Sequence, residues 1–360
     1  MGLKVCLSIS TRIIVLVLTL GFCNYGKTQD STYYLSAYGL SGETLKQELN
    51  KLISNHIEFP YTATTTDVWD ILKQTDEDIN DSNNVILLYS GRSINAAQEY
   101  NSGSGWSREH VWAKSRGDFG TSEGPGTDVH HLRPADVSVN STRNNRNFDN
   151  CSNCSDVIDN GINTGSKTDI DQWIFEPRDE VKGDVARMVF YMAIRYEGNG
   201  SEPDLELTTA LLSKSDKRPL HSVTSTLLKW HLEDPVNDFE RKRNTIIYND
   251  FQKNRNPFID YPELAEYIWG KDVGSIWRPS LNFVEVNLEA NDITVYPNPT
   301  NGIINISGKY SVIKVYTQSG KELNSFKNGI VDLSEYKKGI YLIRIVSQKG
   351  EAQSFEVLKL

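Results

Sequence analysis

Trp106-Ser-Arg-Glu-His-Val-Trp112 is the most informative segment of this 360-residue chain, and two related segments follow it closely. They are Thr127-Asp-Val-His-His-Leu-Arg-Pro-Ala-Asp136 and Val139-Asn-Ser-Thr-Arg-Asn-Asn145. Three of the six histidines of the chain, His110, His130 and His131, fall within these segments. A neutral imidazole can take up a proton at physiological pH because its unperturbed pKa is about 6.5. The clustering predicts a catalytic site rather than histidines scattered over a surface.

Glu109 and Asn140 supply the kind of oxygen atom that a hard divalent cation prefers. Asn140 is expected on a helix that begins near Pro134 or Ala135. Proline suits the first helical position, and Asp136 suits the first turn. These residues predict a Mg²⁺ site, with Ca²⁺ or Mn²⁺ as alternative ions.

This set of residues suits the hydrolysis of phosphodiesters. A diester is anionic and repels hydroxide, so the site must neutralise charge and generate its nucleophile in place. A metal ion with few protein ligands keeps positions open for phosphate and water, and it stabilises the transition state by several kcal/mol. His110, as a positioned general base, adds roughly 10²–10⁴-fold. Arg133 or Arg143 can clamp the phosphate through two hydrogen bonds.

The adjacency of Glu109 and His110 sets a geometric condition. Neighbouring residues on a regular strand point to opposite faces. Both side chains therefore reach one site only where the strand ends or bulges. Four glycines flank the pair and permit such an irregularity, namely Gly103, Gly105, Gly117 and Gly120.

Other polar residues near the motif allow two interpretations. Only one of His130 and His131 can face the site if both lie on a strand. A structural hydrogen-bonding role is favoured for each, and His130 is the expected neighbour of the site. Arg187 belongs to an apolar helical pattern, so it is either buried against a carboxylate or reaches the phosphate.

The charge of the motif region gives no support for nucleic-acid binding. Six cations are offset by six acids: Arg108, Lys114, Arg116, Arg133, Arg143 and Arg146 against Glu109, Asp118, Glu123, Asp128, Asp136 and Asp149. A basic groove must then come from distant parts of the chain, such as Arg187, Arg195 and Lys253 or Arg255. The net charge of −9 does not exclude a nuclease, because such an enzyme needs only a local cationic groove.

The three segments resemble the bacterial endonuclease I family, whose active site is a ββα-metal motif. The resemblance extends from Tyr33 to Trp269. It includes Lys182-Gly-Asp-Val-Ala-Arg187, Tyr191-Met-Ala-Ile-Arg-Tyr196 and Gln252-Lys-Asn-Arg-Asn-Pro-Phe-Ile-Asp260. The implied fold class is α+β, a ββα-metal nuclease core with surrounding helices.

The resemblance also implies a role for each residue of the site. His110 would activate water, Glu109 and Asn140 would bind Mg²⁺, and the products would carry 5′-phosphate and 3′-hydroxyl ends. The other candidates are Arg143 and His130 for catalysis, and Arg133, Arg187 and Asn145 for substrate binding.

This chain departs from the family at two positions. The family has Arg-Gly-Asn after the metal-binding helix, whereas this chain has Arg143-Asn144-Asn145. Asn144 therefore replaces the glycine, which leaves the roles of Arg143 and Asn145 open. Ala113 replaces a common proline, a change that we interpret as structurally minor.

Residues 1–29 have the pattern of a signal peptide. Lys4 and Arg12 precede an apolar run, residues 13–22, that is far too short to cross a membrane. A lipoprotein site at Cys23 is disfavoured because Phe22 is bulky. No later segment is apolar enough to span a bilayer, so the sequence predicts no stable membrane span.

Cys151 and Cys154 are the cysteines expected in the mature chain, because Cys6 and Cys23 lie in the leader. In an exported protein this pair predicts a short disulfide. A zinc site would need two more ligands, and the sequence has no second pair of this kind.

The rest of the chain divides into a nuclease domain, 31–280, and a tail, 285–360. Apolar periodicity predicts helices in the first region from Ser41 onward and at 183–196, 223–231, 238–252 and 262–269. The tail alternates β-type segments with turns and predicts a small antiparallel β-sandwich. Its expected strands are 293–296, 303–306, 312–316, 339–346 and 353–358.

The tail resembles the C-terminal sorting domains of the type IX secretion system. The resemblance depends on Val295-Tyr-Pro-Asn-Pro-Thr-Asn-Gly302, the segment Gly339-Ile-Tyr-Leu-Ile-Arg344 and the basic residue Lys359. It implies that the tail is an address for outer-membrane export machinery. A generic β-sandwich binding module is the alternative.

These features predict a secreted or cell-surface endonuclease that acts on DNA, and also on RNA, through the phosphate backbone. No base-reading element is apparent in the sequence. The alternatives are an extracellular phosphodiesterase for small substrates and a non-enzymatic surface-binding protein.

Overall fold

The computed structural model describes residues 33–278, 293–308, 310–317, 321–346 and 352–360. The expected signal peptide, with Cys6 and Cys23, lies outside these residues. Among the residues that are described, no helix has both the length and the apolar character needed to cross a membrane.

The predicted first helix is present as α1, Gly42–Ser54. Ser41 precedes it in an extended conformation, and Leu45, Leu49 and Ile53 are buried along one face. The next helix, α2 (Val68–Thr75), begins with a capping box between Asp67 and Asp70. Such reciprocal hydrogen bonds satisfy the free amide groups of a first turn.

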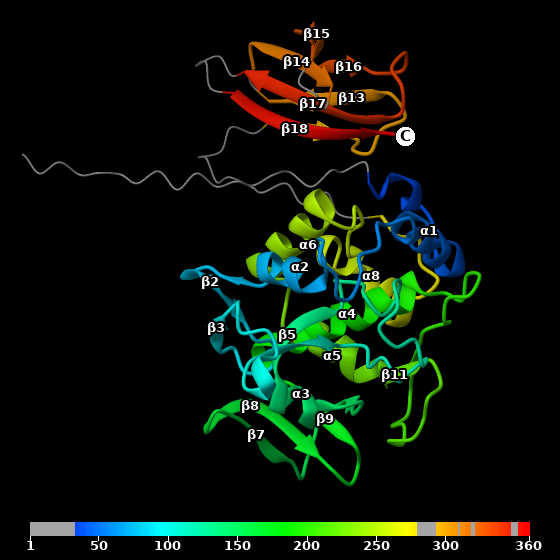
Figure 1. The fold of residues 1–360 in the computed structure, drawn as a ribbon. Helices are drawn as coiled ribbons and strands as arrows, with labels where there is room; N and C mark the ends of the chain where they lie inside the picture. Colours follow the sequence, from blue (N-terminus) through cyan, green and yellow to red (C-terminus); the bar gives the residue numbers. More distant parts are fainter. Residues whose placement is uncertain (1–32, 279–292, 309, 318–320, 347–351) are drawn as a thin grey trace, which may run out of the picture. The chain divides into compact units, whose positions relative to one another are not determined.

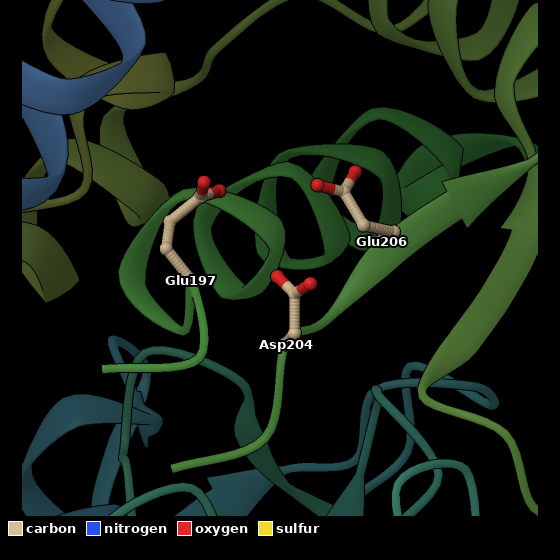
Figure 2. A group of neighbouring side chains, drawn as sticks. All are labelled: Glu197, Asp204 and Glu206. Carbon is tan, nitrogen blue, oxygen red and sulfur yellow. The ribbon is translucent and has the colours of Figure 1, made fainter. Parts of the chain in front are cut away.

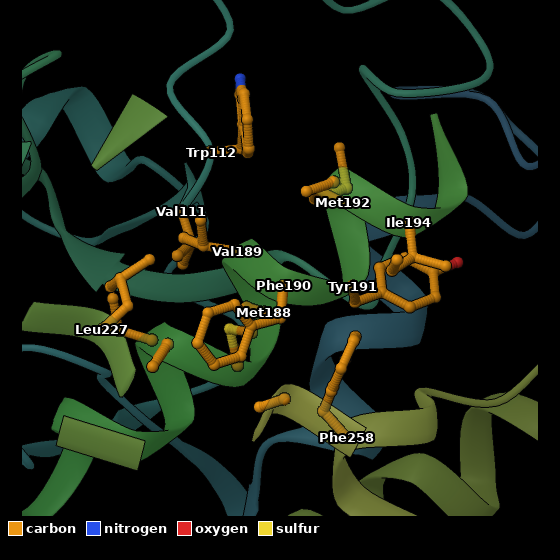
Figure 3. Packing of buried hydrophobic residues seen from close by; sticks show 14 of the residues in the cluster. Val111, Trp112, Met188, Val189, Phe190, Tyr191, Met192, Ile194, Leu227 and Phe258 are labelled. Atoms are coloured by element: carbon orange, nitrogen blue, oxygen red, sulfur yellow. The ribbon is translucent and has the colours of Figure 1, made fainter. Parts of the chain in front are cut away.

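Helix α4 (Lys182–Arg195) forms the centre of the nuclease domain (Figure 1). Every residue of 183–195 is buried, as expected of a helix that is surrounded by protein on all sides. It contacts α1, α5 (Thr224–Glu233) and α7 (Pro257–Asp260). Figure 3 shows part of this packing, with Met188, Phe190, Met192, Val111, Trp112 and Leu227 among its side chains.

The predicted C-terminal helices of this domain are present as α6 (Asp238–Asp250) and α8 (Leu264–Trp269). The remaining short helical turns are η1 (Leu35–Ala37), η2 (Asn101–Gly103) and η3 (Asp179–Val181). The mixed helix and strand content confirms the α+β class that the sequence predicts.

Several small sheets surround these helices. One sheet has the order β1-β2-β3, from Glu77–Asp78, Asp81–Ile86 and Ser93–Asn95. Another has the order β6-β9-β8-β7, from Asn147–Phe148, Ile174–Glu176, Ile162–Asp169 and Ser155–Asp159. Strands β10 (Glu206–Thr208) and β11 (Leu220–Val223) form a parallel pair.

The motif segments form a two-stranded antiparallel sheet followed by a helix. Strand β4 (Trp106–His110) pairs with β5 (Leu132–Asp136), and α3 (Val137–Arg143) follows directly. The register places Glu109 opposite Arg133 and His110 opposite Leu132.

The helix start predicted near Pro134 or Ala135 is wrong. Both residues belong to β5, where they pair with Arg108 and Ser107. Asp136 is the N-cap of α3 rather than part of its first turn, because its Oδ1 accepts the backbone N–H groups of Ser138 and Val139.

The described part of the tail forms two antiparallel sheets that share one apolar core. The first has the order β12-β13-β16 and the second β15-β14-β17-β18. Five of these strands match predicted segments: β12 (Thr294–Tyr296), β13 (Ile303–Ser307), β14 (Val312–Thr317), β17 (Gly339–Val346) and β18 (Ala352–Lys359). Strands β15 (Glu322–Phe326) and β16 (Ile330–Asp332) were not predicted from the sequence, because they are short and largely exposed.

Candidate active site

Glu109, His110 and Asn140 line a single pocket with a volume of about 420 Å³. The other lining residues come from the segments around them: Tyr61, Ser107, Arg108, Ala113, Lys114, Ser115, Val137, Ser141, Asn144 and Asn145. Strand β4 and helix α3 thus bring together the three residues on which the proposed chemistry depends.

Glu109 and His110 occupy the last two positions of β4. The chain leaves the regular strand immediately after them, so the alternation of faces no longer separates the two side chains. Both line the pocket. The position at a strand end satisfies the geometric condition set by their adjacency.

The carboxylate of Glu109 is buried and held by two side chains. The hydroxyl of Tyr89 donates to Oε1 at 2.7 Å, and Nε of Arg143 lies 3.2 Å from the same oxygen. Burial raises the pKa of Glu109 to about 6, while Arg143 and Tyr89 act in the opposite direction. A cation in the pocket would favour the ionised form, which is the form that binds a metal.

Asn140 is oriented by a hydroxyl of the neighbouring strand. Its Nδ2 donates to Oγ of Ser107 at 2.9 Å, and that hydroxyl donates to the carbonyl of Ala135 at 3.3 Å. With the amide nitrogen engaged, Oδ1 is the ligand atom that Asn140 offers. A buried carboxylate and an amide oxygen on one pocket fit a hard divalent cation that keeps other positions open.

His110 has a defined tautomer. Its Nε2 lies 2.9 Å from the carbonyl oxygen of Gly126, so Nε2 carries the proton and Nδ1 carries the lone pair. The ring stacks on Tyr61 with centroids 5.7 Å apart. Burial, followed by the nearby His131, lowers the pKa of His110 well below 6.5. The imidazole is therefore neutral at physiological pH, as a general base must be.

The histidine beside His110 is His131 and not His130, which corrects the expectation from the sequence. The rings of His110 and His131 lie 5.6 Å apart. Nε2 of His131 lies 2.8 Å from the carbonyl of Pro125, and its Nδ1 accepts from the backbone N–H of Trp112.

His130 packs in a different direction. Its ring lies 4.4 Å from that of Tyr191, and its Nε2 lies 3.2 Å from Oδ1 of Asn254. It does not line the pocket. Two neighbouring histidines thus separate because one faces the β4 side of the loop and the other faces α4.

Asp128 anchors the loop that carries the carbonyl of Gly126. This buried carboxylate accepts hydroxyl hydrogen bonds from Tyr191 at 2.8 Å and Tyr196 at 3.0 Å, both near the end of α4. Gln252 donates to its other oxygen at 3.1 Å. Despite burial, the neighbouring histidines and the hydrogen bonds hold the pKa of Asp128 well below its usual range.

The arginines predicted to bind the phosphate do not belong to the pocket lining. Arg133 is buried between Asp76 and Asp184. Arg143 contacts Glu109, and its Nη2 lies 2.9 Å from Nε2 of His221.

Arg187 pairs through two hydrogen bonds with Glu240, at 2.6 and 2.8 Å. Of the two interpretations of Arg187, the structure favours burial against a carboxylate. Arg195 and Arg255, two residues of the expected basic groove, pair with Glu202 and Asp260.

Two cations that sequence reasoning missed do line the pocket. They are Arg108 and Lys114. The guanidinium of Arg108 lies 3.4 Å from the ring centre of Tyr61 and 4.1 Å from that of Trp69. The equal numbers of cations and acids in the motif region did not reveal this excess of positive charge in the pocket, although Arg108 is the residue next to Glu109. The pocket lining contains two permanent cations and one carboxylate.

The backbone conformation of Asn144 explains why the endonuclease I family has a glycine at this position. Its φ is 52° and its ψ is −128°, a region that strongly favours glycine. Asn145 follows it and lines the pocket. Its Nδ2 donates to Ser115 and to the carbonyl of Lys214, and its Oδ1 accepts from the indole of Trp173 at 2.8 Å.

Cys151 and Cys154 form a disulfide, with Cα atoms 5.8 Å apart. This separation is within the normal range for such a bond. The bridge closes a short loop between β6 and β7, away from the lining of the pocket.

A second group of carboxylates lies near the end of α4 and contains Glu197, Asp204 and Glu206 (Figure 2). The ammonium group of Lys46 lies 2.7 Å from Glu197 and 2.8 Å from Glu206. The protein thus provides the cation for this group, which we interpret as an ion-pair network rather than a metal site.

The chain is similar to known proteins over both of its regions. Residues 41–263 match the family model of endonuclease I, and residues 294–358 match the secretion system C-terminal sorting domain. An extracellular ribonuclease of Bacillus subtilis (strain 168) is 52% identical over 243 residues, which cover 66% of this chain and 78% of that protein. An extracellular ribonuclease of Bacillus amyloliquefaciens is 52% identical over the same shares.

Proposed function

Because the chain belongs to the endonuclease I family and is thus a secreted nuclease, we propose that it cuts DNA and RNA within the strand by a one-metal mechanism. The observation that carries this proposal is the convergence of Glu109, His110 and Asn140 on one pocket. In this proposal β4, β5 and α3 are the ββα-metal motif. The sorting domain implies that secretion machinery recognises the tail.

The metal-binding residues are Glu109 and Asn140. The family typically depends on a divalent metal, and the two oxygen donors favour Mg²⁺ over softer ions. When bound, the ion supplies Lewis-acid stabilisation of the crowded, negatively charged transition state. Tyr89 and Ser107 hold the two ligands in place from behind.

His110 acts as the general base. Its Nδ1 removes a proton from water while Nε2–H remains bonded to the carbonyl of Gly126, which stabilises the imidazolium that forms. The water oxygen bonds to phosphorus and the bond from phosphorus to the 3′-oxygen breaks. The 3′-oxygen then takes a proton from solvent, and the products carry 5′-phosphate and 3′-hydroxyl ends.

Arg108 and Lys114 are the residues that bind the scissile phosphate in this proposal, since they are the cations of the pocket lining. We assign this role to them and not to Arg133 and Arg187, because the guanidinium groups of those two residues pair with buried carboxylates. Contacts to phosphate carry no sequence information, so cleavage is not specific for base sequence. The names of the two ribonucleases favour RNA as a substrate, and the endonuclease I family favours DNA.

Cleavage of a closed circular substrate tests the proposal against a phosphodiesterase for small substrates. Wild-type protein should convert supercoiled plasmid to nicked and linear forms in Mg²⁺, degrade structured RNA, and do neither in chelator. His110→Ala should lower the rate roughly 10²–10⁴-fold while Mg²⁺ binding persists. Activity confined to small diesters, or undiminished cutting by His110→Ala, would overturn it.

A further inference from the structure

Most arginines of the nuclease domain pair with carboxylates, but three arginines in or near the pocket lining do not. Arg108, Arg116 and Arg146 form no ion pair with a carboxylate among residues 33–278, and the other exception, Arg278, is exposed. Within the described residues, the buried arginine ε-nitrogens that lack both a hydrogen bond and an ion-pair partner belong to Arg108, Arg116 and Arg146, whereas that of Arg143 lies 3.2 Å from Oε1 of Glu109. Unsatisfied buried groups are rare in native proteins, and their partners are commonly a water, an ion or a ligand.

These arginines lie in or near the lining of the pocket, and two of them lie close to Asn145. Arg108 lines the pocket itself, and Arg116 donates from Nη2 to the carbonyl of Asn145 at 2.9 Å. Arg146 is the next residue along the chain. In a protein of net charge −9, such a concentration of carboxylate-free cations points to an anion from outside.

Arg146 and Lys214 converge on the indole ring of Trp173. The guanidinium carbon of Arg146 lies 4.0 Å from a ring centre and the ammonium of Lys214 lies 4.8 Å from one. Arg146 is 7% exposed, and burial, followed by Arg143, lowers its pKa. Two like charges held at one ring repel each other unless an anion approaches them.

The segment that carries Lys214 is fixed beside the pocket. The side chain of Asn145 donates to the carbonyl of Lys214 at 3.0 Å. Arg116 donates to the carbonyls of Ser213 at 3.0 Å and Asp216 at 2.9 Å. The side chain of Lys214 is exposed to solvent. Its backbone is held in place by a hydrogen bond from Asn145, which lines the pocket.

We propose that Lys214, supported by Arg146, forms a second phosphate-binding subsite beside the catalytic pocket, which binds a backbone phosphate flanking the scissile one. This inference deepens the proposed function and depends on it for the identity of the polymer. The subsite recognises charge and not base. It therefore acts on polynucleotides and is idle with a substrate that has a single phosphodiester.

Binding and cleavage measurements test the subsite separately from the chemistry. In the first, a short fluorescent DNA duplex is titrated in chelator with wild-type, Lys214→Ala, Lys214→Arg and Lys242→Ala proteins at several salt concentrations. Lys242 is an exposed lysine of α6 and serves as the matched control. One lost phosphate contact should reduce the slope of log Kd against log salt by about 0.9, and only in Lys214→Ala.

In the second measurement, the same proteins cleave plasmid DNA and a nitrophenyl phosphodiester in Mg²⁺. Lys214→Ala should raise KM for plasmid several-fold, with kcat within about twofold of wild type, and should leave the small diester unaffected. Lys214→Arg should restore plasmid KM. An unchanged salt slope in Lys214→Ala, or an equal loss on the small diester, would overturn the subsite. Absence of cleavage by wild-type protein would instead count against the proposed function, because the binding slope is read without turnover.

Discussion

Nε2 of His110 lies 2.9 Å from the backbone carbonyl oxygen of Gly126, so the tautomer of the proposed base depends on a loop rather than on a side chain. The preceding carbonyl, that of Pro125, lies 2.8 Å from Nε2 of His131. Two consecutive carbonyls therefore orient two imidazoles, and Asp128 ties the loop to α4. The position of this loop should matter for catalysis and not for metal binding.

Gly126→Ala should lower kcat by about 10²-fold, because small displacements of catalytic groups have effects of this size. A Cβ atom at this position would lie 2.5 Å from the carbonyl oxygen of Ser122 and 2.8 Å from Cα of Thr121, so the loop would have to move. Plasmid cleavage and Mg²⁺ titration measure the two effects. Gly200→Ala has open space but a positive φ of 63°, so it is the control for a strained glycine substitution that does not displace this loop. A normal kcat in Gly126→Ala would exclude the proposed role of this carbonyl.

Ser107→Ala should weaken Mg²⁺ binding about 10–100-fold, since removal of the partner of a metal ligand has this effect in other sites. The hydroxyl accepts the amide N–H of Asn140, and without it the amide can rotate. Saturating Mg²⁺ should restore most of the rate. Ser141→Ala is a matched control in the same pocket, because its hydroxyl bonds to the carbonyl of Val137. Equal effects of the two substitutions would contradict this explanation.

Asn144→Ala should cost about 1–2 kcal/mol of stability, and Asn144→Gly should be neutral or stabilising. The reason is the positive φ of 52°, which glycine adopts without strain and alanine does not. Urea unfolding monitored by tryptophan fluorescence gives the ranking. A variant with alanine as stable as the wild type would show that the turn relaxes to another conformation.

Stability should fall by several kcal/mol between pH 7 and pH 4. All six histidines have pKa values lowered chiefly by burial, to about 4 in His131 and about 3 in His130. The unfolded chain therefore binds more protons below pH 6.5 than the folded chain. The stability that the neutral histidines contribute is fully present above pH 6.5. It is lost as the pH falls toward the pKa values of the histidines in the folded protein.

Five carboxyl groups with raised pKa values act in the opposite direction, namely Glu109, Glu197, Asp234, Glu240 and Glu263. The six histidines and the lowered pKa of Asp128 outweigh them in this prediction. Urea titrations at a series of pH values measure the net effect. A free energy of unfolding that is constant over this range would contradict the predicted linkage.

Local patterns were enough to predict the longer helices of the nuclease domain and five strands of the tail, but not the strands of the nuclease domain. Apolar spacing predicted α1 and α4 because a buried helical face is a short-range property of the sequence. The start of α3 was predicted too early, because Pro134 suits a helix start and is equally tolerated in β5, where the Asp136 cap decides the boundary.

The environment of the site was harder to predict, because it depends on contacts between distant segments. The assignment of His130 and His131 depends on α4 and on the carbonyl of Pro125, which the motif does not specify. The same holds for charge. Arg133 pairs with Asp76, which is distant in sequence. Arg108 packs against an aromatic ring and belongs to the pocket lining.

The carboxylate-free cations beside the pocket also bear on how the enzyme meets its polymer. Travel along a nucleic acid requires a weak attraction spread over a broad protein surface. The net charge of −9 opposes such a broad attraction, and the carboxylate-free arginines Arg108, Arg116 and Arg146 lie in or near the pocket. We expect it to dissociate after each cut and to attack distributively, so that a population of long molecules shortens together instead of one at a time.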